Sequence, residues 1–93
     1  MRVGALEVRL GLSGVNSLKE KRRIIRSLKD RVRNKFNVAI AEIDDMDVWR
    51  AATLGIVTVA NDGRFVESAL SKVLNYVRAN PESSLIDFDL EVF

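Results

Sequence analysis

The chain has 93 residues, of which 47% are hydrophobic and 30% are charged, and its formal net charge is +2. This length and composition predict a single globular domain over residues 1–93 and argue against a disordered chain. The chain has neither cysteine nor histidine. Disulfides, thiolate metal sites and cysteine nucleophiles are therefore excluded, and the commonest general base is missing. We expect a non-catalytic protein with no cofactor and no metal.

The start of the chain does not read as a secretory signal, because Arg2, Glu7 and Arg9 interrupt its alternating apolar residues. No apolar run approaches the roughly 18 residues that a membrane span needs. We therefore expect a cytoplasmic protein with no membrane partner. The sequence identifies no small-molecule ligand.

Residues 2–12 alternate between two sets of side chains, which predicts a strand with one face in the core. A helix is predicted to follow, from Ser17 to about Phe36. Ser17 and Glu20 have the spacing of a capping box, in which Ser17 accepts from the amide of Glu20 and Glu20 reaches back to the amide of Ser17. Asn37 is expected to end the helix in a left-handed conformation.

Positive charge is concentrated on this helix. It holds nine of the fifteen basic residues and two acidic ones, a net charge of +7, which leaves −5 for the rest of the chain. Six basic side chains project onto one continuous strip, which we call the cationic stripe: Lys19, Arg22, Arg23, Arg26, Lys29 and Arg33. Neighbouring cations repel one another, whereas solvated helices usually interleave the two signs. The stripe therefore favours an anionic partner over a merely solvated face, and we predict that it binds nucleic acid.

Lys21 departs from the pattern of the same helix. The helical projection puts it in the middle of an apolar stripe: Leu18, Ile24, Ile25, Leu28, Val32 and Phe36. Two interpretations remain open. The aliphatic stem of Lys21 snorkels to solvent, or its ammonium is buried against a carboxylate.

Residues 38–43 predict a short second strand, and four carboxylates lie at or beyond its end: Glu42, Asp44, Asp45 and Asp47. Their spacing lacks the regularity of an EF-hand loop, so a turn is favoured over a metal site. Residues 49–60 carry apolar side chains on both parities, which predicts a central strand. Trp49, the only tryptophan, is expected to act as a lid on the core rather than as a base-stacking platform.

A second helix is predicted over about 63–79, with Asp62 as its N-cap and Asn80-Pro81 as its end. The last segment, 85–93, alternates again. Ile86, Phe88, Leu90 and Val92 are predicted to face the core, and Asp87, Asp89 and Glu91 to face outward.

The order of elements is therefore β-α-β-β-α-β. It predicts an α+β ferredoxin-like sandwich, in which a four-stranded antiparallel sheet carries both helices on one face. The first and third strands would be central. The acidic last strand would lie beside the first, where Arg9 is expected to pair with its carboxylates.

Several segments resemble the YlxP-like family of small bacterial proteins. They are SLKEKR after the first strand, FNV, AEID with a tryptophan shortly after it, and LGIVTVAND before the second helix. The resemblance implies a ferredoxin-like, cytoplasmic protein with no established enzymatic activity. Genes of this family often neighbour translation and ribosome-maturation genes, which implies a link to RNA or the ribosome. The family has no agreed site residues to transfer.

The sequence therefore favours two functions. The first is a non-catalytic RNA-binding or ribosome-associated accessory module that uses the cationic stripe. The alternative is a homodimer or other homo-oligomeric scaffold, or a protein-interaction module, that associates through the open sheet face. An apolar patch of Val3, Ala5 and the outer side chains of the third strand would form its contact.

Overall fold

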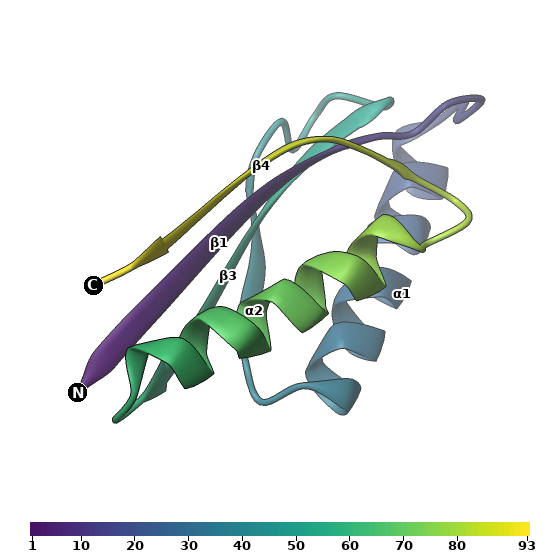
Figure 1. Ribbon diagram of the computed structural model, residues 1–93. Helices are drawn as coiled ribbons and strands as arrows, with labels where there is room; N and C mark the ends of the chain where they lie inside the picture. The colour runs from purple at the N-terminus through teal and green to yellow at the C-terminus, as the bar shows by residue number, and fades with distance from the viewer.

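Two helices pack on one face of a four-stranded sheet, and the two ends of the chain lie close together (Figure 1). The computed structural model describes residues 1–93. The elements are β1 (Arg2–Gly11), α1 (Leu18–Lys35), β2 (Ala39–Asp44), β3 (Ala51–Ala60), α2 (Gly63–Arg78) and β4 (Ser84–Val92). The sheet is antiparallel with the order β2-β3-β1-β4. The predicted ferredoxin-like α+β sandwich is thus confirmed, with β1 and β3 in the centre.

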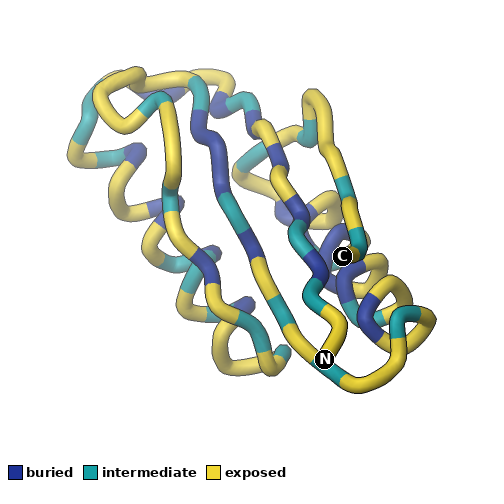
Figure 2. The backbone as a smooth tube through the Cα atoms, turned by 90° about the vertical axis from the view of Figure 1, so that its left-hand side faces the viewer, coloured by how far each residue is buried: buried dark blue, intermediate teal, exposed yellow.

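The core lies between the sheet and the two helices. Alternate side chains of β1 and β3 meet the apolar stripes of α1 and α2 there. The opposite face of the sheet has no covering layer, and Figure 2 shows how burial alternates along the central strands when the molecule is viewed from that side. Neither helix is long and apolar enough to cross a membrane.

A β-bulge in β4 changes the predicted alternation at one residue. Arg9 pairs with Asp87, but the next residue, Leu10, pairs with Leu85, so Ile86 is an extra residue in β4. Its side chain lies over Gly11 on the open face and is 60% exposed. The prediction that Ile86 faces the core was therefore wrong, because a bulge shifts the side-chain parity by one.

The ends of α1 differ in detail from the prediction. The Ser17 Oγ accepts from the amide of Glu20 at 3.1 Å, as predicted, but the Glu20 carboxylate accepts from the amide of Asn16 rather than that of Ser17. The predicted left-handed Asn37 was also wrong. The helix ends at an extended Phe36, and Asp45 is the only non-glycine residue with a positive φ. The chain turns directly from the helix into the approach to β2, so no left-handed cap forms.

Candidate nucleic-acid interface

The cationic stripe lies on the outward side of α1. Lys29 is half-buried, and the other five members of the stripe are exposed. The surface around Arg22 and Arg26 is lined only by polar and charged side chains of α1 and its N-cap. It therefore offers cations and hydrogen-bond donors beside the carboxylates of Glu20 and Asp30, with no hydrophobic residue among them.

Two members of the stripe already have carboxylate partners. Arg23 Nη2 lies 3.1 Å from Oε2 of Glu82, and Arg33 Nη1 lies 3.2 Å from Oδ1 of Asp30. Both are exposed ion pairs, which typically contribute at most about 1 kcal/mol and exchange readily for another anion. Arg33 also donates to the carbonyl oxygen of Ile40 at 3.0 Å.

The other four members have no carboxylate within ion-pair distance: Lys19, Arg22, Arg26 and Lys29. They follow one another at intervals of three, four and three residues, so they form a row along one side of the helix. An open positive surface therefore remains on α1 after the internal ion pairs are made.

Lys21 is fully buried, and its ammonium holds the loop between β2 and β3. Nζ lies 3.0 Å from Oε2 of Glu42 and donates to the carbonyl oxygens of Asp45 and Met46, the latter at 3.3 Å. Glu42 Oε2 has no partner in hydrogen-bond geometry, so its contact with Lys21 is an ion pair without a well-aligned hydrogen bond. The structure therefore confirms the interpretation that the ammonium of Lys21 is buried against a carboxylate. The alternative, that the stem of Lys21 snorkels to solvent, was wrong.

The carboxylates around the β2–β3 loop do not converge on one point. Glu42 lies on the helix side of the sheet with Lys21, whereas Asp45 accepts from Thr53 Oγ1 at 2.8 Å and lies 4.0 Å from Nε of Arg9. No group of three or more carboxylates is placed to hold a metal ion. Arg9 lies opposite Asp87 of β4, but the predicted pairing with a carboxylate of β4 was wrong, because the ion pair of Arg9 is with Asp45.

Trp49 is 50% exposed, so the prediction of a core lid was wrong. β3 begins only at Ala51, which leaves Trp49 in the preceding loop. The next residue, Arg50, anchors this loop to the approach to α1. Its side-chain Nε donates to the carbonyl oxygen of Val15 at 3.0 Å, and its backbone carbonyl oxygen accepts from the amide of Leu12. Trp49 is thus held at the same end of the molecule as the first turn of α1, with half of its surface open to solvent.

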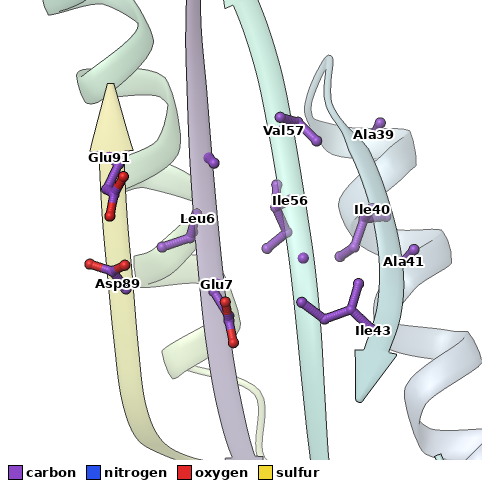
Figure 3. Close-up of a pocket in the computed structure, with 12 residues that line it drawn as sticks. Leu6, Glu7, Ala39, Ile40, Ala41, Ile43, Ile56, Val57, Asp89 and Glu91 are labelled. Atoms are coloured by element: carbon purple, nitrogen blue, oxygen red, sulfur yellow. The ribbon is translucent and has the colours of Figure 1, made fainter. Parts of the chain in front are cut away.

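The open sheet face carries a groove of about 430 Å³ between its strands, shown in Figure 3. Of the predicted patch, Ala5 on β1 and Gly55 and Val57 on β3 line this groove, whereas Val3 does not. Further apolar side chains of the groove come from β2, through Ala39, Ala41 and Ile43, which sequence reasoning did not include. Their alternation with Ile40 and Glu42 was the available signal, but it spans too few residues to assign a face without the fold.

Comparison with known proteins places the chain in a family. The profile of DUF503, described as a protein of unknown function, matches residues 3–90. The uncharacterized protein YlxP of Bacillus subtilis (strain 168) is 36% identical over 80 residues, which cover 86% of this chain and 87% of that protein.

Among solved structures, the chain is similar to the apo form of LarC2, the C-terminal domain of a cyclometallase involved in the synthesis of the NPN cofactor of lactate racemase. The TM-score is 0.51 at 14% identity, and the match covers 100% of this chain but only 55% of LarC2. At that identity the likeness supports the fold alone. The sequence matches carry the assignment: the chain belongs to the DUF503 family and is a homologue of YlxP.

Proposed function

We propose that this protein is a non-catalytic, ribosome-associated or otherwise RNA-binding accessory module, and that α1 binds the phosphate backbone of RNA. The observation that carries the proposal is the row of four cations on α1 that have no carboxylate partner. The cationic stripe from Lys19 to Arg33 extends over about 21 Å along the helix axis at 1.5 Å per residue. A strip of this length suits several successive phosphates.

The character of the stripe favours binding with little sequence preference. Lysine and arginine contacts to phosphates position a nucleic acid, while base-edge and stacking contacts specify its sequence. The lining of the α1 surface contains no aromatic or other hydrophobic side chain on which a base would stack. Affinity on this surface would come mainly from the release of counterions, and it would therefore depend strongly on salt.

The open sheet face is a poor surface for RNA. RNA-recognition motifs stack bases on aromatic residues of their central strands. Here the corresponding face carries Glu7 on β1 and Asp87, Asp89 and Glu91 on β4. These carboxylates repel phosphates, which directs an RNA ligand to the opposite, helical side of the molecule.

A charge-reversal experiment tests the proposal. Arg22→Glu with Arg26→Glu removes two free cations from the cationic stripe, and we expect it to weaken binding of a labelled single-stranded oligouridine by more than about tenfold at low salt. The matched control is Arg64→Glu with Lys72→Glu, which makes the same change in net charge on the exposed side of α2. If both variants lost affinity equally, or if neither did, binding would not be located on α1.

A second candidate function is a protein-interaction module that associates through the open sheet face, either with another copy of the chain or with a different protein. The groove in that face and the exposed Val57 and Val59 favour this candidate. Exposed apolar patches on small proteins commonly mark interaction surfaces. The two functions use opposite sides of the molecule, so they are compatible.

A further inference from the structure

The open sheet face is divided lengthwise into an apolar half and an acidic half. The strand register sets side chains of β2, β3, β1 and β4 side by side in rows across the sheet. Two successive rows read Ala41, Gly55, Glu7, Asp89 and Ala39, Val57, Ala5, Glu91. Each row therefore runs from small apolar residues on β2 to a carboxylate on β4, as Figure 3 shows.

The apolar half is a shallow trough rather than a flat surface. Gly55 and the alanines of β2 have small side chains and form its floor. The larger side chains of Ile43 and Val57, which are 47% and 42% exposed, protrude beside them. The Cβ position of Gly55 would lie 3.1 Å from Cγ2 of Ile43, so Ile43 leans over the glycine. A trough of this shape accepts a row of apolar side chains from a partner.

A second copy of the chain does not complement this face. If two sheets stacked about a two-fold axis parallel to the strands, β4 of one copy would lie over the apolar β2 of the other. With the axis across the strands, β4 would lie over β4. Asp89 and Glu91 would meet no cation in either arrangement, because Arg9 is the only basic residue on this face and it lies beside Asp45.

The outer face of α1 of a second copy does not fit the open sheet face either. It supplies cations, but its surface contains no hydrophobic side chain that would fill the trough of another copy. The occupant must carry apolar and basic groups side by side, and neither the open sheet face nor the outer face of α1 does so.

We propose that the open sheet face docks an amphipathic helix of a partner protein, one whose apolar stripe has lysine or arginine along one flank. Asp89 and Glu91 are two residues apart on β4, a separation of about 7 Å along the strand. Basic residues at i and i+4 of a helix are about 6 Å apart along its axis, so they would meet both carboxylates while the apolar stripe lies over the trough. This inference rests on the second candidate function and names the partner class for it. It does not depend on RNA binding by α1.

A peptide experiment tests this proposal directly. The probes are two labelled helical peptides with the same leucine stripe, one flanked by lysines and the other by glutamates. We expect the lysine-flanked peptide to bind the full chain in the micromolar range and the glutamate-flanked peptide to bind at least about tenfold more weakly. Asp89→Lys with Glu91→Lys should abolish this preference. Its matched control, Asp47→Lys with Glu67→Lys, alters exposed carboxylates without ion pairs elsewhere and should leave it intact.

A separate variant tests the role of the apolar half of the open sheet face. Ala41→Gln places a polar side chain in the trough from an exposed position on the edge strand β2, so it should fold, and it should weaken the lysine-flanked peptide about tenfold or more. Sedimentation equilibrium on the unmodified chain completes the test, and we expect a monomer.

Each contrary outcome has a distinct meaning. Equal binding of both peptides would keep the sheet face as an interaction surface but overturn the inferred basic helix. Self-association that Ala41→Gln abolishes would identify a second copy as the occupant and overturn it as well. If neither peptide bound and the chain stayed monomeric, both this inference and the second candidate function would fail, while the proposal for α1 would be unaffected.

Discussion

The ammonium of Lys21 lies 3.0 Å from the carboxylate of Glu42, and this contact joins the first turn of α1 to the edge strand β2. Lys21 has no solvent exposure, and the Glu42 side chain keeps only 18%. Two carbonyl oxygens of the β2–β3 loop complete the surroundings of the ammonium. A buried charge of this kind is tolerated only because its partners replace the water that it has lost.

Replacing Lys21 by methionine should destabilise the fold by about 3 kcal/mol, because a side chain of similar length remains while Glu42 and the two carbonyls lose their cation. Urea unfolding followed by circular dichroism measures the change. The double variant Lys21→Met, Glu42→Leu should recover part of the loss, since it no longer leaves a carboxylate unpaired. Strict additivity of the two single substitutions would show that the two side chains are not coupled.

A larger side chain at Gly4 should destabilise the fold. An added Cβ would collide with Cγ1 of Val66 and lie 2.6 Å from Cδ1 of Leu70, on the face of β1 against which α2 packs. We expect Gly4→Ala to cost about 1–3 kcal/mol in the free energy of unfolding, because overpacking a core forces neighbours to move. Gly55→Ala is the matched control, since its Cβ would meet only the exposed Ile43 side chain. A smaller loss at Gly4 than at Gly55 would contradict this account of the packing of α2.

The fluorescence of Trp49 should report the solvent-exposed β2–β3 loop and not the environment of the core. Its fluorescence in the folded protein should be quenched readily by acrylamide, because half of the side chain is exposed. Trp49→Ala should cost less than about 1 kcal/mol, well below the usual loss for a buried tryptophan. A blue-shifted emission that acrylamide does not quench would restore the lid interpretation.

The sequence alone was sufficient for the order of the elements and for the position of the cationic stripe, because both follow from the spacing of side chains within one segment. Lys21 was recognisable as an anomaly for the same reason. Its partner was not, since Glu42 lies 21 residues further along the chain and reaches Lys21 only when β2 takes its place at the sheet edge.

The remaining features depend on how strands are paired. The bulge that turns Ile86 outward has no mark in the alternating sequence of β4, because it arises from the register with β1. The groove in the sheet similarly combines residues of all four strands, which are brought into the order β2-β3-β1-β4 only in the folded sheet. Trp49 was misplaced because the start of β3 was predicted two residues too early, and strand ends are poorly fixed by local propensity.

The dependence of RNA affinity on salt tests the central claim most directly. The slope of log affinity against log salt should lie near −3 if only the four free cations of the cationic stripe bind phosphates, and near −4 if Arg23 and Arg33 also exchange their carboxylates for phosphates. Fluorescence anisotropy with a single-stranded oligouridine gives this slope. Absence of binding at low ionic strength, or a slope near zero, would contradict the assignment of α1 as an RNA-binding surface.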